Sequence, residues 1–448
     1  AIGWGGCLAD DMGLGKTLQT LCFLQKLYDE KKSVKALIVC PTSLIYNWQA
    51  EIDKFTKGIN YIIYHGAERA FPKPKSNKWN LLITSYGTLR NDIELFSTIN
   101  FEVTILDESQ AIKNPVSLIT KAVQLINTKY RFVLSGTPVQ NNTFDLYAQL
   151  NFCNPGLLGN QEFFKTEFAT AIDKYGDKEK SEQLRKMVFP FILRRTKEQV
   201  AKDLPDKTET VMYCEMGSYQ QKVYDTVKED YKLRILGKID EVGVAKAAFL
   251  ILEGLNKLRQ ICDCPSLITD VEKNRFKQSS IKLDELMREI EENISNHKML
   301  IFSQFLGMLA LVKEKLEADG IRYVYLDGST PAKDRKMLVD KFQTDKTIQV
   351  FLISLKAGGV GLNLTAADYV YVIDPWWNPA VEDQAIDRTH RIGQTKKVFA
   401  YKMICKNTIE EKIMQLQAQK KSLAKELISE DASFVKKLTK DDVAWLLT

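Results

Sequence analysis

The stretch Asp-Asp-Met-Gly-Leu-Gly-Lys-Thr, which begins at Asp10, has the residue types of a phosphate-binding loop. Gly13 and Gly15 allow the backbone to turn its N–H groups toward phosphate oxygens. Lys16 can pair with the β- and γ-phosphates, and the hydroxyl of Thr17 can coordinate Mg²⁺. The full Gly-x4-Gly-Lys-Ser/Thr pattern is not met, because Asp10 stands where its first glycine would be. The stretch predicts a nucleotide site with Mg²⁺. The alternative is an ordinary glycine-rich turn between a strand and a helix.

A pair of carboxylates, Asp107 and Glu108, directly follows the apolar run Val103–Leu106. Such a run predicts a buried strand, so the pair is expected at a strand end. There Asp107 suits coordination of Mg²⁺, and Glu108 suits polarisation of an attacking water. A solvated turn at the end of the strand is the alternative for any Asp-Glu pair.

Two arginines in the second half of the chain have the spacing of a single helical face. Gln384, Arg388 and Arg391 stand at positions i, i+4 and i+7. Asn378, with a proline after it, predicts the start of this helix, and Gly393 predicts its end. A guanidinium makes forked contacts with a phosphoryl group and keeps its charge. We therefore expect both arginines to reach the γ-phosphate of the bound nucleotide from another domain. Two solvated surface arginines are the alternative.

Two further segments follow predicted strands and could act on a nucleic acid. The glycines of Ser354–Asn363 leave N–H groups that suit a nucleic-acid phosphate, although a flexible loop explains them too. The hydroxyls of Ser135–Pro138 could relay between the nucleotide and a nucleic-acid groove. A turn that ends in proline explains the second segment equally well.

Short apolar runs alternate with helix-length segments twice along the chain. Near-continuous apolar strands with such spacing indicate parallel sheets that are covered on both faces. The sequence therefore predicts an α/β protein with two doubly wound lobes, at residues 1–210 and 211–448. The runs are Ala36–Cys40, Tyr61–Tyr64, Leu81–Thr84, Val103–Leu106 and Arg131–Leu134, then Met299–Phe302, Tyr323–Leu326, Val350–Ser354, Tyr369–Ile373 and Val398–Met403.

The composition narrows the class of protein. A chain of 448 residues with 45% hydrophobic and 27% charged residues suits two or three globular domains. It has no apolar run near the ~20 residues that span a bilayer, which excludes a transmembrane protein. Its net charge of +6 permits nucleic-acid binding without arguing for it. Its eight cysteines form no C-x-x-C pair and it has only three histidines, which argues against structural zinc and for reduced thiols inside a cell. It opens at Ala1 rather than Met, so we expect part of a longer protein.

Taken together, the motifs resemble the Snf2 family of superfamily 2 ATPases, which are DNA-translocating motors, and the resemblance covers essentially the whole chain. The string Asp-Pro-Trp-Trp-Asn-Pro from Asp374 is among the most specific to that family. The strings that carry the resemblance are Asp10–Thr17, Cys40–Leu44 with Asn47-Trp48, Thr84–Tyr86, Asp107–Gln110, Ser135–Gln140, Phe191–Lys197, Ile301–Phe305, Leu355–Leu364, Asp374–Pro379 and Gln384–Gln394.

The resemblance implies a fold and a set of functional residues. The fold would be two RecA-like lobes, with helical protrusions near residues 155–185 and 215–260 and a bracing helix over about 408–448. ATP and Mg²⁺ would be the cofactors, and double-stranded DNA would lie across both lobes. The implied catalytic residues are Lys16, Asp107, Glu108, Arg388 and Arg391, with Gly13, Gly15, Thr17 and Gln384 beside the nucleotide and Thr17 and Asp107 on the metal. The implied contacts with the DNA backbone are Thr42, Ser43, Thr84, Ser303, Gln304 and Lys356.

Two departures from the family pattern limit what the resemblance implies. The motif that reads adenine should lie upstream of Ala1, so the choice of ATP rests on the resemblance alone. The carboxylate motif reads Asp-Glu-Ser-Gln rather than Asp-Glu-Ala-His, which moves the chain away from many strand-separating helicases and keeps both carboxylates. We therefore expect an ATPase that moves along double-stranded DNA without separating its strands. Contacts with phosphates carry no base information, which suits such movement.

Two other functions stay open at this point. One is a strand-separating helicase, and the other is an ATP-gated DNA-binding scaffold without productive turnover. Nucleosomes or transcription machinery are the expected DNA-bound partners, and no membrane partner is expected. Compact insertions favour a prokaryotic motor in the cytoplasm and nucleoid, whereas a eukaryotic one would be nuclear. The sequence leaves the oligomeric state and the biological target undecided.

Overall fold

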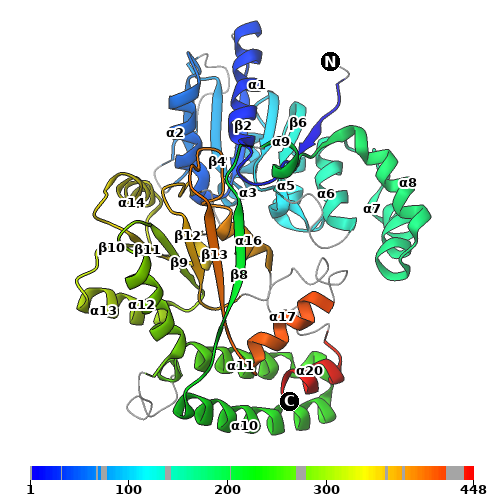
Figure 1. The fold of residues 1–448 in the computed structure, drawn as a ribbon. Coiled ribbons are helices and arrows are strands. Elements are labelled where there is room, and N and C mark those ends of the chain that lie inside the picture. Colours follow the sequence, from blue (N-terminus) through cyan, green and yellow to red (C-terminus); the bar gives the residue numbers. More distant parts are fainter. Residues whose placement is uncertain are drawn as a thin grey trace. The chain divides into compact units, whose positions relative to one another are not determined.

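The computed structural model describes residues 3–31, 33–66, 69–71, 78–136, 143–201, 203–268, 279–358, 362–375, 379–419 and 438–448. The chain divides into two compact units, residues 1–203 and 204–448. This division lies before the predicted boundary at residue 210, because β8 (Lys207–Cys214) is an edge strand of the second unit's sheet. The two units are shown in Figure 1 and are described in turn.

The described part of the first unit contains a seven-stranded sheet, in which every strand pair is parallel. Its strand order is β3-β4-β2-β5-β6-β1-β7. The middle strands β2 and β4 are buried along their whole length, as expected for apolar runs covered on both faces. The strands are β1 Gly6–Leu8, β2 Ala36–Cys40, β3 Tyr61–Tyr64, β4 Leu81–Ser85, β5 Phe101–Leu106, β6 Thr128–Leu134 and β7 Ile192–Leu193.

Helices follow most strands of this sheet, and short polar residues start several of them. The hydroxyl of Ser85 accepts a hydrogen bond from the N–H of Thr88 and so caps α3. Ser117 caps α5 in the same way. The segment predicted as a helical protrusion at residues 155–185 contains α7, a π-helical run Lys165–Lys174 and most of α8. The helices are α1 Lys16–Lys31, α2 Ile45–Phe55, α3 Tyr86–Asn91, α4 Ile93–Phe96, α5 Leu118–Gln124, α6 Thr143–Cys153, α7 Gln161–Phe164, α8 Lys178–Val188 and α9 Lys197–Val200.

The second unit contains another all-parallel sheet, with six strands among its described residues and the order β10-β11-β9-β12-β13-β8. The prediction of two parallel-sheet α/β lobes is therefore confirmed. The strands other than β8 are β9 Met299–Ser303, β10 Tyr323–Leu326, β11 Val350–Ser354, β12 Tyr369–Val372 and β13 Val398–Cys405.

A long helical hairpin lies at one end of this second sheet. Helices α10 (Ser218–Val242) and α11 (Val244–Asp263) turn at Gly243, whose φ of 79° lies in the left-handed region that favours glycine. Figure 1 shows these helices side by side, with α17 and α20 packed against them. The other helices are α12 Ile281–Asn293, α13 Leu306–Ala318, α14 Ala332–Thr344, α15 Leu355–Gly358, α16 Pro379–Ile386, α17 Ile409–Gln419 and α20 Lys440–Leu446.

The single bracing helix expected over residues 408–448 is not what the structure has. Among the described residues, α17 covers Ile409–Gln419, and Thr439 has extended backbone directly before α20, so α20 begins as a separate helix at Lys440. Thr439 starts α20 with a capping box, in which its side chain bonds the N–H of Asp442 and Asp442 bonds back. A capping box satisfies the first N–H groups of a new helix, so it marks a helix start rather than a helix interior.

An ionic network is buried in the core of the second unit. The ammonium of Lys282, on α12, donates to Asp263 at 3.0 Å, to Glu410 at 2.6 Å and to the carbonyl of Ile373 at 2.7 Å. All three charged side chains are fully buried. Burial raises the pKa of both Asp263 and Glu410, and the charge of Lys282 partly offsets that effect. The network joins α11, α12 and α17, and thereby attaches the helical hairpin to the sheet.

We predict that Lys282→Met lowers the stability of the second unit by about 3–5 kcal/mol, because it leaves two buried carboxylates without their cation. Hydrogen exchange of the α12 amides in the full chain measures this unit separately. Lys313→Met is the control, since Lys313 makes an ion pair with Glu317 at 3.9 Å on the surface and should change stability by no more than about 0.5 kcal/mol. Equal effects of the two substitutions would contradict the role given to the buried network.

Candidate nucleotide-binding site

The loop predicted to bind phosphate connects β1 to α1. Gly13 (φ 88°) and Gly15 (φ 73°) both adopt left-handed backbone, which explains the glycines at these positions. Helix α1 begins at Lys16, so the loop presents the N-terminus of a 16-residue helix, which favours an anion. The ammonium of Lys16 donates to the loop carbonyls of Asp10 at 2.6 Å and Asp11 at 3.2 Å. Thr17 is half-buried in the first turn of α1.

The structure gives a physical reason for Asp10 in the place of a glycine. The Asp10 carboxylate is fully buried and accepts hydrogen bonds from the N–H and the Nε of Arg195, at 3.0 and 3.1 Å. The amide of Gln19 donates to the same carboxylate at 3.1 Å. Burial alone would raise the pKa of Asp10, but the hydrogen bonds from Arg195 and Gln19 outweigh burial and hold the pKa below its usual value. An ionised Asp10 therefore ties the loop to Arg195.

The segment that carries Arg195 packs against the phosphate loop and forms backbone hydrogen bonds with it. Strand β7 pairs with β1, the N–H of Ala9 donates to Leu193 at 2.7 Å, and the N–H of Asp11 donates to Arg195 at 3.0 Å. The segment Phe191–Lys197 carries part of the family resemblance, but its residue types alone predict no role at the nucleotide site. The sequence shows Arg195 directly after Arg194, but it does not show that Asp10, which lies 185 positions away, is the partner of Arg195.

The carboxylate pair lies at the carboxyl end of β5. Asp107 is buried, and its Oδ2 accepts a hydrogen bond from the indole N–H of Trp48 at 2.9 Å. Its Oδ1 accepts from the N–H of Glu108 at 2.9 Å. Glu108 has φ 49° and ψ 56°, a left-handed conformation that is strained for a residue with a side chain. The amide of Gln110 donates to Glu108 Oε2 at 2.8 Å, so the Gln that departs from the family pattern orients the carboxylate.

The loop and the carboxylate pair meet at one edge of the first sheet. Both follow the carboxyl ends of parallel strands, which lie on the same side of the sheet. Burial and the charge of Glu108 raise the pKa of Asp107 to about 7, whereas Trp48 and the charge of Lys16 lower it. Two adjacent carboxylates and a hydroxyl are hard oxygen ligands, which fits Mg²⁺. Asp107 and Thr17 would hold the ion, and the ion would neutralise phosphate charge.

We predict that binding of Mg²⁺ with nucleotide releases about one proton near pH 6 and almost none at pH 8, because Asp107 must be ionised to coordinate the ion. Without metal, the raised pKa of Asp107 increases the free energy of unfolding below about pH 4, and this contribution is lost as the pH rises through about 7. Calorimetry in buffers of different ionisation enthalpy counts the protons, and Asp107→Asn corrects for the nucleotide's own titration. Equal proton counts in wild type and Asp107→Asn would contradict the prediction.

The predicted helical face of arginines is wrong. Helix α16 ends at Ile386, and the hydrogen bonds then change from four-residue to three-residue spacing, since the N–H of Arg388 donates to Ala385. The hydroxyl of the buried Thr389 donates to the carbonyl of Ile386 at 2.7 Å, which competes with a further helical turn. Gln384 alone of the three predicted residues lies on α16, while Arg388 and Arg391 lie in the turns after it.

The two arginines differ in exposure. Arg388 is buried, with 2% of its surface exposed, and its carbonyl accepts from the N–H of Leu364 at 3.0 Å. Arg391 is half-buried, and its Nε donates to the carbonyl of Asp387 at 3.1 Å. Gly393 has left-handed backbone with φ 104°, but the prediction that it ends the helix is wrong, because α16 already ends at Ile386. The predicted cap Asn378 lies outside the described residues.

Three of the predicted DNA contacts have their side chains engaged inside their own unit. Thr84 is fully buried, and its hydroxyl donates to the carbonyl of Tyr64 at 2.9 Å. Ser303 is fully buried and accepts from the N–H of Phe305 at 3.0 Å. Gln304 is half-buried and accepts from Arg259 at 3.1 Å. Thr84 and Ser303 are therefore enclosed in this conformation, because an apolar run that predicts a strand also buries its last polar residue.

The other predicted DNA contacts are at the surface or undescribed. Thr42 is exposed at the start of the 3₁₀ helix Thr42–Leu44, and Lys356 is exposed on α15. The side chain of Ser43 lies outside the described part of the chain, as do residues 137–142 and 359–361 of the two additional loops. Gly136, at the start of the first of those loops, packs so closely on Met12 that a Cβ would lie 2.9 Å from it.

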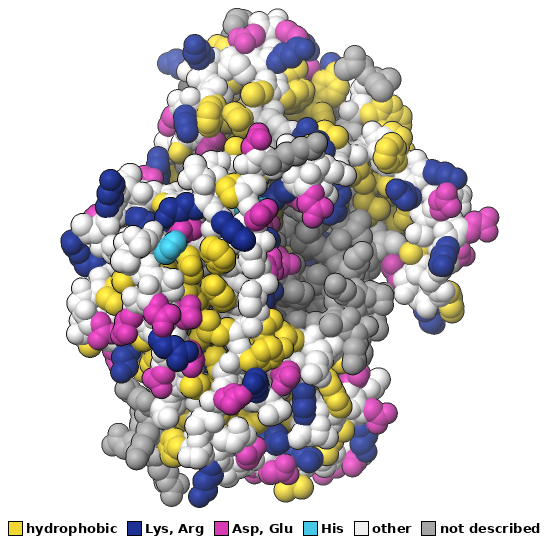
Figure 2. All heavy atoms as spheres, in the orientation of Figure 1, with side chains coloured by type: hydrophobic (Ala, Val, Ile, Leu, Met, Phe, Trp, Pro, Cys, Tyr) yellow, Lys and Arg dark blue, Asp and Glu magenta, His cyan; other side chains and the backbone are white. Residues whose placement is uncertain are grey.

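The distribution of charged side chains on α10 and α8 does not by itself identify a nucleic-acid-binding surface. On α10 basic and acidic residues pair with each other, as in Arg234 with Asp230 at 3.3 Å and Lys238 with Glu241 at 3.0 Å. Figure 2 shows basic and acidic side chains intermixed along this helix and along α8. Any DNA contact would therefore depend on local groups rather than on the modest net charge.

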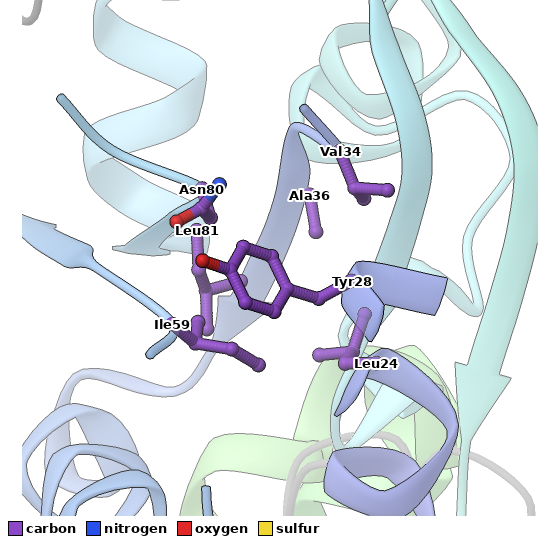
Figure 3. Close-up of a pocket in the computed structure, with 7 residues that line it drawn as sticks. All are labelled: Leu24, Tyr28, Val34, Ala36, Ile59, Asn80 and Leu81. Carbon is purple, nitrogen blue, oxygen red and sulfur yellow. The ribbon is translucent and has the colours of Figure 1, made fainter. Parts of the chain in front are cut away.

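An apolar pocket lies at the opposite edge of the first sheet from the nucleotide site. Leu24 and Tyr28 of α1 face the first residues of β2 and β4, Ala36 and Leu81, as Figure 3 shows. Val34, Ile59 and Asn80 complete its lining. The amino ends of these strands lie far from the phosphate loop, so the pocket is no part of the nucleotide site.

None of the described helices is long and apolar enough to cross a membrane.

Comparisons with known proteins agree with this geometry. Residues 2–267 match the SNF2-related domain, and residues 281–393 match the helicase conserved C-terminal domain. The chain is 40% identical over 98% of its length to an uncharacterized ATP-dependent helicase of Mycoplasma genitalium, covering 42% of that protein. It is 36% identical over its full length to a putative ATP-dependent helicase/translocase of Bacillus subtilis, covering 49% of that protein. It is 34% identical over 96% of its length to the TATA-binding protein-associated factor MOT1 of Saccharomyces cerevisiae, covering 26% of that protein. The chain thus spans less than half of each of these relatives.

Among solved structures, the chain is similar to a SWI2/SNF2 ATPase core of Sulfolobus solfataricus in complex with double-stranded DNA. The identity is 37%, the alignment covers 99% of this chain and 92% of that one, and the TM-score is 0.47.

Proposed function

Because this chain belongs to the SNF2-related family, we propose that it hydrolyses ATP with Mg²⁺ and uses the energy to move along double-stranded DNA without separating the strands. The predicted family is confirmed, and the predicted enzyme class, a DNA-dependent ATPase, is the class of that family. The observation that carries the proposal is the meeting of the phosphate loop and the carboxylate pair at one sheet edge, where the charge of Lys16 acts on Asp107.

In the first unit, each proposed role follows from position. The N-terminus of α1 and the ammonium of Lys16 would hold the triphosphate, and Asp107 and Thr17 would hold Mg²⁺. Glu108 would orient and polarise the attacking water. Its carboxylate suits this role because Gln110 fixes it and it remains half-buried rather than enclosed.

In the second unit, we assign Arg388 and Arg391 to the γ-phosphate and Gln384 to the nucleotide. The two arginines do not lie on one helical face, but they can still act together. Two guanidiniums in consecutive turns can approach one phosphoryl group. The buried Arg388 would supply a fixed charge, and Arg391 is only half-buried. ATP binding and hydrolysis would then alternately favour and release contact with these arginines, which is how hydrolysis could drive motion.

The proposed DNA contacts are the main chain at Thr42 and at Gly87, which is exposed directly after the buried Thr84–Tyr86, and the side chains of Thr42 and Lys356. Phosphate contacts fix position without reading bases, in keeping with movement along any sequence. One relative is named as a TATA-binding protein-associated factor, which supports a DNA-bound protein of the transcription machinery as a target. The proposal places the protein inside the cell, where duplex DNA is present.

The proposal is tested by ATP turnover with no nucleic acid, single strands, duplex and reconstituted nucleosomes. We expect duplex to stimulate turnover most, and a triplex-displacement assay to detect movement. A strand-displacement assay distinguishes the helicase alternative, which predicts separated strands. Turnover that is the same with and without duplex would overturn the proposal.

A further inference from the structure

Each polar group of Asp107 forms a hydrogen bond with a neighbour, and three of these neighbours precede it in the chain. Its N–H donates to the carbonyl of Val39 at 2.8 Å, and its Oδ1 accepts from Glu108. The indole of Trp48 donates to Oδ2, and the hydroxyl of Tyr86 donates to the backbone carbonyl at 2.8 Å. Trp48 and Tyr86 are both buried, so water does not replace these bonds.

Each of these two residues is directly connected to a segment proposed to contact DNA. The 3₁₀ helix that starts at Thr42 runs without a break into α2, which carries Trp48. Tyr86 is the first residue of α3 and follows Thr84 at the end of β4. A displacement of either segment must therefore move a hydrogen-bond donor of Asp107, since a helix moves as a rigid element.

The Asp107–Glu108 peptide, whose carbonyl accepts the hydrogen bond from Tyr86, leads directly into a residue with strained backbone. Tyr86 holds the carbonyl of the Asp107–Glu108 peptide, and Glu108 has left-handed backbone with φ 49° and ψ 56°. A non-glycine residue stays in this region only when its surroundings fix it. Trp48 fixes the carboxylate before the strained residue and Tyr86 fixes the peptide that leads into it, so together they set the direction of the Glu108 side chain.

We propose that Trp48 and Tyr86 are positioning residues that transmit DNA binding to the catalytic carboxylates. Contact of duplex with the exposed Thr42, or with the exposed Gly87 next to Tyr86, adjusts the two donors, and these adjust Asp107 and the strained peptide at Glu108. Neither residue touches nucleotide in this scheme. The inference rests on the proposed function, because it explains how duplex would stimulate turnover.

The test removes one donor atom at a time and measures turnover with and without saturating duplex. Tyr86→Phe removes the hydroxyl alone, and Trp48→Phe removes the indole N–H. We expect the ratio of stimulated to basal turnover to fall about tenfold for Trp48→Phe, because its bond is to a charged group, and about threefold for Tyr86→Phe. The affinity for duplex and the KM for ATP should change by less than about twofold, since neither residue contacts them.

Matched controls separate transmission from a general loss of structure. Trp79 is buried in the same unit, and its indole N–H makes no hydrogen bond within the described residues, so Trp79→Phe should keep the ratio. Tyr64 is buried on the edge strand β3 and donates to Asp92 at 2.9 Å, so Tyr64→Phe should also keep it. If Trp48→Phe does not fold, benzothienylalanine at position 48 replaces the N–H by sulfur in a ring of the same shape.

The outcomes distinguish this inference from the proposed function. Wild-type turnover without any response to duplex would overturn both. Stimulated wild type, with variants at positions 48 and 86 that keep the full ratio, would overturn this inference and leave the proposed function standing. Basal and stimulated turnover that fall by the same factor would show a static structural role and would also overturn it.

Discussion

Glu108→Gln should lower duplex-stimulated ATP turnover by about 10²–10⁴-fold, the usual contribution of a positioned catalytic base. Binding of ATP with Mg²⁺ should remain close to that of wild type, because in the proposed site Lys16, Thr17 and Asp107 hold those groups. The substitution keeps the shape of the side chain, and Gln110 can still donate to the amide oxygen at position 108. Single-turnover phosphate release and nucleotide titration measure the two effects separately.

Glu102→Gln is the matched control for this prediction. Glu102 lies on the same strand, β5, but is partly exposed to solvent and pairs with the exposed Lys31 at 2.7 Å. Its removal should leave turnover unchanged, since surface ion pairs contribute little. If wild type and Glu108→Gln were equally slow with saturating duplex, the ATP-gated scaffold without productive turnover would be the better description.

Arg391→Ala should bind ATP almost normally and lose about 10³–10⁵-fold in turnover, the range for a guanidinium that stabilises charge on a transferring phosphoryl group. Its position makes this substitution interpretable, because Arg391 is half-buried in a turn and its Nε donates to the nearby carbonyl of Asp387 at 3.1 Å. Arg388→Ala is less informative, since Arg388 is buried and its loss would also destabilise the unit. Equilibrium nucleotide binding and duplex-stimulated turnover are the two measurements.

Two companion variants sharpen the result for Arg391. Arg391→Lys keeps the charge but not the fork of donors, so it should recover only part of the turnover. Ile392→Ala alters the adjoining residue, whose side chain is 63% exposed, and should behave as wild type. Loss of ATP binding in Arg391→Ala, rather than loss of hydrolysis, would count against a role in phosphoryl transfer.

Several features could be predicted because they are recorded locally in the chain. Apolar runs of strand length, each followed by helix-length segments, identified both sheets, since burial on two faces requires continuous apolar strands. Gly13 and Gly15 predicted a loop that turns its N–H groups toward phosphate, and both glycines have left-handed backbone, which glycine adopts without strain. The position of Asp107 and Glu108 directly after such a run placed them at a strand end, where the structure has them.

The helix that was predicted to carry both arginines shows where local pattern fails. Spacing of i, i+4 and i+7 describes a helical face only while the helix continues, and α16 ends before Arg388. The chain turns there because the buried Thr389 bonds the carbonyl of Ile386. Burial of a threonine by the surrounding fold is a tertiary fact, which the spacing of arginines does not contain.

By itself, the sequence determined the fold class, the family and the residues most suited to hold a nucleotide, because these depend on short patterns and on residue chemistry. Only the tertiary structure decided which distant groups support them: Arg195 on Asp10, 185 positions away, and Trp48 on Asp107, 59 positions away. It also decided that Thr84 and Ser303 are enclosed. The physical reason is that strand order and helix packing determine which residues become neighbours. In a sheet of parallel strands, neighbouring residues can be separated by any distance along the chain.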